Sequence, residues 1–497
     1  MTYLAPNPST RLRPVPSNVE GTSLLGGCNS MNMKHLVICI CVLTPLKILS
    51  KTKKRLIGVL FLTGLLLVAS CVPDRQLKPP AKPVERADGF VIFLTGSELG
   101  ALKPCGCSGG QLGGLDRRWA VLNSVPRQRR LVVDTGSLVE SDSEQDLIKF
   151  NIIIQAFGLL DYDVVNLTEK DIEIAKNLGL LDHIGLVLNV ISADLPTDVN
   201  LPVKFTKQLA LKDKTVTVTI AAFDAQSSRI EQIAELFPPH TGGQAINILI
   251  LNHCEPTIVD SIAEKAPVVD CLVCPSDSDE PRVIGDPDEK PLVFSVGRFG
   301  RYICKLDVTD TKDQDRLELS FHAIPIGEDL KQGASLVRLY KDYQQLVKEA
   351  HLLEKYPRFA LPDGLKYVGS KSCKPCHEYE YQTWSEKGHA HAYATLEEVG
   401  SQYDPQCIIC HVVGMEYESG FISEEKTSHL KDVGCENCHG PGSEHARTLG
   451  VVQTGEPKSS CLDCHTPDKS GEYAANEQRY LEKIRHWREP NTADNVK

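Results

Sequence analysis

The sequence predicts two folded domains in series, an α/β layered domain followed by a mainly α-helical, loop-rich domain. The first prediction rests on short runs rich in Val and Ile that alternate with helical segments between residues 89 and about 325. The second rests on the last 130 residues or so, where short polar segments surround four pairs of closely spaced cysteines. A chain of 497 residues with 41% hydrophobic content is long enough and apolar enough for both domains.

The charge and the cysteine count narrow the classes of function. The net charge is −11, and long basic runs are confined to the N-terminal region, so a nucleic-acid partner is not expected. Eighteen cysteines are too many for a typical cytosolic protein unless most of them bind a metal ion or a cofactor.

The first 71 residues have the pattern of a targeting sequence. A basic group, Lys51 to Arg55, precedes the apolar run LIGVLFLTGLLLVAS, which has the length of a signal peptide. The following Cys71 completes a pattern that resembles the bacterial lipoprotein box, so we expect residues 51–71 to be a lipoprotein signal and Cys71 to be lipidated. A plain membrane anchor is the alternative, and both interpretations place the rest of the chain outside the cytoplasm, on a membrane.

Two further N-terminal segments are predicted to lie outside any fold. Residues 1–50 precede a complete signal peptide, so we interpret them as an over-extended start. Residues 72–88 are rich in Pro and charge, which is typical of a tether.

The α/β domain is predicted for residues 89–328. Its strands are apolar throughout in several places, which indicates a sheet that is covered on its faces. The predicted strands are FVIFLTG, RLVVDTG, YDVVNL, GLVLNV, TVTVTIAAF, INILILN, VVDCLVC, PLVFSVG and YICKLDV. Residues 329–360 then connect to the second domain, mostly as one long amphipathic helix from Ser335 to Lys355.

Four CxxCH motifs dominate the second domain, residues 361–497. The two thiols of such a motif can bond to the two vinyl groups of one porphyrin, and the adjacent imidazole then points at the iron. Zinc sites built from CxxC pairs are the alternative, but they do not require a histidine after each second cysteine. We therefore expect four covalently bound hemes, at Cys373, Cys376 and His377; Cys407, Cys410 and His411; Cys435, Cys438 and His439; and Cys461, Cys464 and His465.

The second axial ligands of these irons are expected to be histidines. Met415 is the one methionine that follows the signal segment, so methionine can serve one heme at most. Bis-histidine coordination lacks the methionine ligand that raises the potential, which favours low-potential electron-transfer hemes. The candidate ligands are His389, His391, His429, His445 and His486.

From Tyr367 to Trp487 the motifs CHEYEYQTWSEKGHAHAYATL, VGCENCHGPGSEHA and IRHW resemble the tetraheme cytochromes that accept electrons from hydroxylamine oxidoreductase. The resemblance implies that His389, His445 and His486 are distal ligands, whereas His391 and His429 match less clearly. It also implies that one heme can be five-coordinate, without saying which.

The order of elements in the first domain is similar to the calcineurin-like metallophosphatases, in particular the 5′-nucleotidase branch. That family places metal ligands after successive strands, but here Thr95-Gly-Ser-Glu98 and Asp134-Thr-Gly-Ser137 stand at the first two positions. Only His253 matches a family ligand. Because two hard cations need several carboxylates and imidazoles, we expect a degenerate domain without phosphatase activity.

The predicted strand ends carry a second candidate site instead. Its members are Cys105, Cys107, His253, Cys254 and Cys274, which would suit a soft metal ion or a redox thiol pair. The alternative is that these cysteines, with Cys271 and Cys304, form disulfides or are small buried residues.

These patterns favour an exported, lipid-anchored protein that passes electrons to and from redox partner proteins. One alternative is a reductase of a small nitrogen or sulfur species at a five-coordinate heme. Another is a metal-binding or partner-binding N-terminal module with the hemes as a relay.

Overall fold

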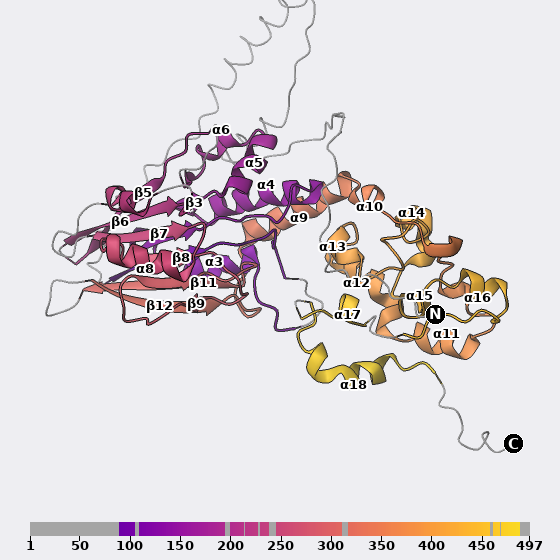
Figure 1. The fold of residues 1–497 in the computed structure, drawn as a ribbon. Coiled ribbons are helices and arrows are strands. Elements are labelled where there is room, and N and C mark those ends of the chain that lie inside the picture. The colour runs from indigo at the N-terminus through magenta and orange to yellow at the C-terminus, as the bar shows by residue number, and fades with distance from the viewer. Residues whose placement is uncertain are drawn as a thin grey trace, which may run out of the picture.

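The computed structural model describes residues 89–104, 109–193, 199–212, 214–226, 229–237, 245–310, 317–457, 461–467 and 469–487. The expected start over-extension, signal peptide with Cys71, and tether therefore lie outside the described residues, as do Cys105 and Cys107. Figure 1 shows an N-terminal domain built around strands and a C-terminal domain of short helices.

The first sheet has six strands in the order β12-β11-β1-β2-β3-β4. Strands β1 to β4 are parallel, and β11 runs antiparallel to both β1 and β12. The bounds are β1 Gly89–Thr95, β2 Arg130–Asp134, β3 Val164–Asn166, β4 Asn189–Ile191, β11 Tyr302–Asp310 and β12 Leu317–Pro325.

The second sheet also has six strands, in the order β5-β6-β7-β8-β10-β9. Strands β6, β7, β8 and β10 are parallel, and β5 and β9 close the two edges in the antiparallel sense. The bounds are β5 Lys204–Leu211, β6 Lys214–Phe223, β7 Ala245–Leu251, β8 Cys271–Cys274, β9 Arg282–Val283 and β10 Leu292–Ser295.

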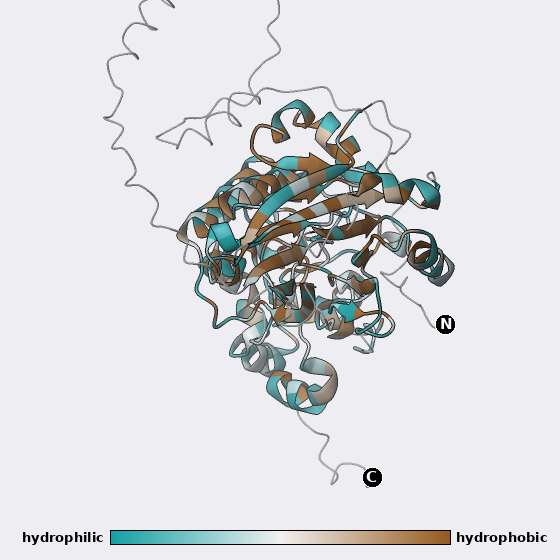
Figure 2. Ribbon diagram, turned by 90° about the vertical axis from the view of Figure 1, so that its left-hand side faces the viewer, coloured by the Kyte–Doolittle hydropathy of each residue, from teal (hydrophilic) through white to brown (hydrophobic). Residues whose placement is uncertain are grey.

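The two sheets pack face to face, and helices cover their outer faces. Alternation along β1 shows this directly, since Phe90, Ile92 and Leu94 join the core between the sheets while Val91 and Phe93 join the core under the helices. The central strands β2, β7 and β8 are apolar and buried almost throughout, whereas the outer strands β5 and β12 are partly exposed (Figure 2). The predicted α/β layered architecture is confirmed.

Helices α3, α4 and α9 pack on the first sheet, and α7 and α8 pack on the second. The helix α4 begins after Ser143, whose side chain accepts a hydrogen bond from the Asp146 amide and so caps the first turn. The bounds are α3 Leu115–Leu122, α4 Glu144–Leu159, α5 Glu169–Asn177, α6 Leu181–Ile184, α7 Ile233–Leu236, α8 Pro256–Lys265 and α9 Ala334–Glu349.

The connecting segment differs from the single long helix that we expected. Helix α9 ends at Glu349, His351 adopts a left-handed conformation with φ of 51°, and a short α10 (Leu352–Lys355) follows. Leu336, Leu339 and Tyr343 of α9 are buried in the core of the first domain. The helix is therefore an integral part of that domain as well as a connection.

The C-terminal domain is helical and loop-rich, as predicted. Its apolar core is small and centres on nine buried residues, which include Tyr393, Met415 and Phe421. Within the described parts of the chain, no helix has the length and apolar character needed to cross a membrane. The bounds are α11 Glu378–Ser385, α12 Ala392–Val399, α13 Pro405–Ile408, α14 Glu424–Thr427, α15 Cys435–His439, α16 Ser443–Arg447, α17 Cys461–Cys464 and α18 Tyr473–Ile484.

Candidate heme sites

Each CxxCH motif forms a tight turn that places its histidine one turn after its first cysteine. In the first and fourth motifs the histidine amide donates to the carbonyl of that cysteine, from His377 to Cys373 at 3.0 Å and from His465 to Cys461 at 2.8 Å. None of the eight cysteines of these motifs is in a disulfide, and none of them is fully buried. The motifs thus present the thiols and imidazole that thioether attachment and iron ligation require.

Thiol contacts show that the motifs lie in two pairs. Cys373 of the first motif contacts Cys435 of the third, and the hydrogen bond from that thiol lowers the pKa of Cys435 to about 7. Cys410 of the second motif contacts Cys464 of the fourth, and this hydrogen bond lowers the pKa of Cys410 to about 6. Hemes attached at these cysteines would lie close to each other within each pair of motifs.

Three proximal histidines face a second histidine across a constant gap. The ring centres are 5.9 Å apart for His377 and His445, and 6.3 Å apart for His465 and His389. They are 6.4 Å apart for His439 and His486. Two imidazoles that each bind one metal ion at about 2 Å from nitrogen have ring centres roughly 6 Å apart. The residues present therefore fit bis-histidine iron at the first, third and fourth motifs.

Hydrogen bonds at the other ring nitrogen orient several of these imidazoles. Nδ1 of His445 donates to the Val452 carbonyl at 2.8 Å, and Nδ1 of His486 donates to the Ile484 carbonyl at 3.0 Å. These bonds leave Nε2 of each ring for the metal, as is usual for histidine ligands.

Burial also favours the neutral, ligating form of the histidines. It lowers the pKa of four rings, because the interior disfavours the charged imidazolium. These rings are His389, His411, His439 and His465.

The second motif differs from the other three. Nδ1 of its His411 donates to the Ala392 carbonyl at 2.6 Å, but among the described histidines no ring contact pairs His411 with a distal partner. Met415 is only 2% exposed and belongs to the apolar core of the domain. His391 and His429, the less clearly matched candidates, are exposed.

Exposed apolar side chains lie next to the paired imidazoles. Leu449 is 86% exposed and Val451 is 83% exposed, in the loop whose Val452 carbonyl binds His445. A porphyrin held between His377 and His445 would have the loop with these apolar side chains beside it.

A buried ion cluster occupies the strand ends of the first sheet. The guanidinium of Arg118 is fully buried and contacts both oxygens of Glu98, at 2.7 and 2.8 Å, and the Tyr162 hydroxyl at 2.7 Å. Asp134 lies in the same cluster and accepts hydrogen bonds from the Thr95 hydroxyl and the Gly136 amide. Burial, and then the charge of Glu98, raise the pKa of Asp134 to about 7.

This cluster occupies the positions at which the resemblance to the metallophosphatases predicts metal ligands. The positive charge in it is the guanidinium of Arg118. The sequence alone did not reveal it, because Glu98 and Arg118 lie 20 residues apart and belong to different elements. The single available signal was the departure from the metal-ligand pattern at Glu98 and Asp134.

The second candidate site is not assembled as expected. Cys254 and Cys274 are joined in a disulfide that ties the end of β7 to the end of β8. The disulfide alternative is therefore confirmed for these two cysteines, and they are corrected as candidate metal ligands. His253 contacts Asp224 at 3.3 Å instead. Cys271 and Cys304 are fully buried in the core between the sheets, as predicted. No cluster of three or more His, Cys, Asp or Glu side chains suited to a metal ion occurs among the described residues.

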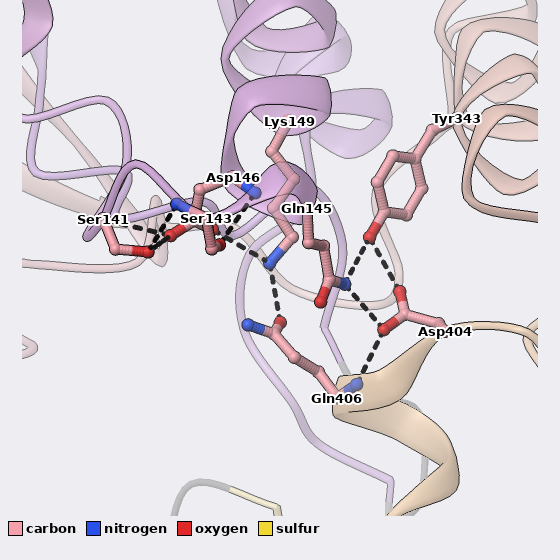
Figure 3. A network of polar contacts seen from close by, with 8 residues as sticks. All are labelled: Ser141, Ser143, Gln145, Asp146, Lys149, Tyr343, Asp404 and Gln406. Carbon is pink, nitrogen blue, oxygen red and sulfur yellow. Dashed lines mark hydrogen bonds and ion pairs between the residues drawn. The ribbon is translucent and has the colours of Figure 1, made fainter. Parts of the chain in front are cut away.

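A polar network that no sequence pattern predicts joins the two domains (Figure 3). Gln145 of α4 and Tyr343 of α9 both bind the carboxylate of Asp404, which precedes the second motif. Lys149 of α4 donates to the Gln406 side chain at 2.6 Å. These groups come from segments far apart in the chain, which is why no local pattern predicts them.

Comparison with known proteins supports the identity of the C-terminal domain. Residues 372–440 match the family model "Cytochrome c554 and c-prime". Cytochrome c-554 of Nitrosomonas europaea is 33% identical over 91 residues, which cover 15% of this chain and 39% of that protein. The chain thus spans about two fifths of the length of this curated relative. Residues 372–440 thus form a cytochrome c554 domain, a family that implies covalently attached heme c.

Two solved structures resemble the N-terminal region. A calcineurin-like phosphoesterase of Bacillus subtilis is 13% identical with a TM-score of 0.40, covering 53% of this chain and 98% of that chain. A 5′-nucleotidase precursor of Thermus thermophilus is 14% identical with a TM-score of 0.41, covering 55% of this chain and 61% of that chain.

Proposed function

We propose that this chain is an exported electron-transfer protein with four hemes in its C-terminal domain. The observation that carries the proposal is the set of three proximal–distal histidine pairs with ring centres 5.9 to 6.4 Å apart. Each heme, when bound, supplies an iron that can accept or release one electron. The protein's own part is to hold the imidazoles in place and to keep the four motifs close together.

The test is a spectroscopic count on the purified holoprotein. Intact mass should show four attached hemes, and the ferric electron paramagnetic resonance spectrum should show three low-spin hemes and one high-spin heme. A mass with fewer hemes in fully matured protein would contradict the four-heme assignment. Four low-spin hemes would instead show that the iron at His411 has a second axial ligand.

A second candidate function follows from His411, which lacks a paired ring among the described histidines. An iron bound by His411 alone on one face could take a small ligand such as nitrite or hydroxylamine on the other, and the chain would then be a reductase. Addition of either ligand should perturb the high-spin signal in that case. An unchanged spectrum, with no consumption of the ligand by reduced protein, would leave electron transfer as the function.

We also propose that the N-terminal domain does not hydrolyse phosphate esters. The Arg118 guanidinium already neutralises Glu98 and competes with any divalent cation for its oxygens. Purified protein should therefore bind no Mn²⁺ in equilibrium dialysis and should not hydrolyse a 5′-nucleotide with added Mn²⁺. Metal-dependent hydrolysis by wild-type protein would refute this part of the proposal.

Export, the lipid anchor and the redox partner proteins belong to the same proposal, and the sequence pattern at residues 51–71 supports the first two. Replacement of Cys71 by Ser should move the protein from the membrane fraction to the soluble extracytoplasmic fraction. Retention in the membrane would favour a plain apolar anchor.

We propose Cys105, Cys107 and His253 as the remaining candidate ligands of a soft metal ion in the N-terminal domain. Metal analysis of the holoprotein before and after replacement of both cysteines by Ser would show any non-iron metal that they hold. An unchanged metal content would favour disulfides for these cysteines too.

A further inference from the structure

The second heme motif is attached to the N-terminal domain at two separate points. The first is Asp404, whose side chain accepts a hydrogen bond from the Gln406 amide at 2.9 Å and so caps α13, the helix that carries Cys407. The second is α12, whose first residue, Ala392, accepts the hydrogen bond from His411. Both elements lie against α9 of the N-terminal domain.

Asp404 is only 8% exposed, and the N-terminal domain satisfies both of its oxygens. Gln145 donates to one oxygen at 2.8 Å, and the Tyr343 hydroxyl donates to the other at 2.7 Å (Figure 3). Gln145 also donates to the Tyr343 hydroxyl at 2.9 Å, which closes a ring of three side chains. Buried and fully satisfied networks of this kind hold one geometry, because any displacement leaves a buried polar atom without a partner.

The other end of α12 is attached to the same helix. Gln344 of α9 donates to the Val399 carbonyl at 2.7 Å and to the Ser401 hydroxyl at 3.1 Å. Because Val399 is the last residue of α12 and Ala392 is the first, this contact fixes the helix whose carbonyl orients the His411 ring. The first, third and fourth motifs instead have a distal histidine that can help to hold their irons.

We propose that Asp404 is a positioning residue for His411, and that the N-terminal domain, through Gln145 and Tyr343, sets the ligand geometry of the second motif. This inference rests on the proposed four-heme function. It assigns the N-terminal domain a role in tuning one heme, since ligand orientation and hydrogen bonding to the ligand both change the properties of a metal centre.

The test compares the variants Asp404→Ala, Asp404→Asn and Tyr343→Phe in the full chain with its hemes attached. Gln345→Ala is the matched control, because Gln345 lies on the same helix but bonds only to the exposed Glu349 carboxylate, one turn away. The measurements are intact mass, the high-spin resonance signal and the midpoint potential of each heme. We expect Asp404→Ala and Tyr343→Phe to broaden the high-spin signal and shift the potential of that heme, with the three low-spin hemes unchanged.

The Asn variant separates position from charge. Asparagine keeps an acceptor for the helix cap and for Gln145, so it should stay close to wild type if position matters. Equal shifts in Asp404→Asn and Asp404→Ala, with none in Tyr343→Phe, would show a simple charge effect and overturn the inference, as would wild-type behaviour of all three. If Asp404→Ala protein loses the second heme, the high-spin signal and the potential of Tyr343→Phe protein decide whether the inference holds. Absence of hemes from wild-type protein would refute the proposed function instead.

Discussion

At the scale of single residues, the histidine pairs give the most direct prediction. His445→Ala should convert the first heme from low spin to high spin, because it removes the ring that faces His377 at 5.9 Å. The resonance spectrum should then show two high-spin hemes. His391→Ala is the control, since His391 is exposed and should leave the spectrum unchanged. A low-spin first heme in His445→Ala protein would mean that another residue is the ligand.

The buried cluster predicts a dependence of stability on pH. The pKa of Asp134 is raised from 3.8 to about 7 in the folded state, so the folded protein binds a proton there that the unfolded chain releases. The free energy of unfolding should therefore fall as pH rises from about 4 to about 7, by up to about 1.4 kcal/mol per pH unit, and should level off above that range. Urea unfolding of the N-terminal domain, followed by circular dichroism, measures this slope.

Asp134→Asn supplies the control for that experiment. The amide cannot ionise, so the contribution of this group to the slope should disappear. The hydrogen bond from the Gly136 amide can persist at the remaining oxygen, and the Thr95 hydroxyl can accept one from the new amide nitrogen. Identical pH profiles for the two proteins would place the titrating group elsewhere.

At the scale of elements, α9 belongs to the core of the N-terminal domain although it follows the last strand. Leu339→Ala should lower the free energy of unfolding of that domain by about 2 to 5 kcal/mol, because Leu339 is only 5% exposed and its truncation leaves a cavity. Leu346→Ala, on the same helix, should cost less than 1 kcal/mol because Leu346 is 39% exposed. Equal losses would argue against the packing of α9 on the first sheet.

The elements that can be predicted from the sequence are those that a short, contiguous stretch of residues determines. The strands at 89–95 and 245–251 are apolar runs, and the CxxCH turns carry their chemistry within five residues. The break at His351 has no such signal, since a left-handed conformation at a residue other than Gly reflects the packing of the helices on either side of it. The Arg118–Glu98 pair and the Asp404 network also escaped prediction, because each joins segments that only the tertiary fold brings together.

At the scale of the whole molecule, the two domains should differ in their dependence on cofactor. The apolar core of the C-terminal domain is small, so its folding should depend on heme attachment. Cys438→Ala should lose the third heme and lower the melting temperature of the C-terminal domain, while the transition of the N-terminal domain stays in place. Intact mass and differential scanning calorimetry measure both effects. Stable, soluble protein with three hemes and two unchanged transitions would contradict this expectation.

The interface between the domains leaves two of the four heme motifs more accessible to other proteins than the other two. In Figure 1, α13 and α17, which carry parts of the second and fourth motifs, lie toward the N-terminal domain, whereas α11, α15 and α16 lie on the far side. Gln111 of the N-terminal domain donates to the Lys469 carbonyl just after the fourth motif, which adds to the contact at Asp404. The redox partner proteins that we propose would thus be able to reach the first and third motifs without displacing the N-terminal domain. Under the proposed function, electrons would then be exchanged with partner proteins at the first and third motifs, while the N-terminal domain covers the side of the second and fourth motifs.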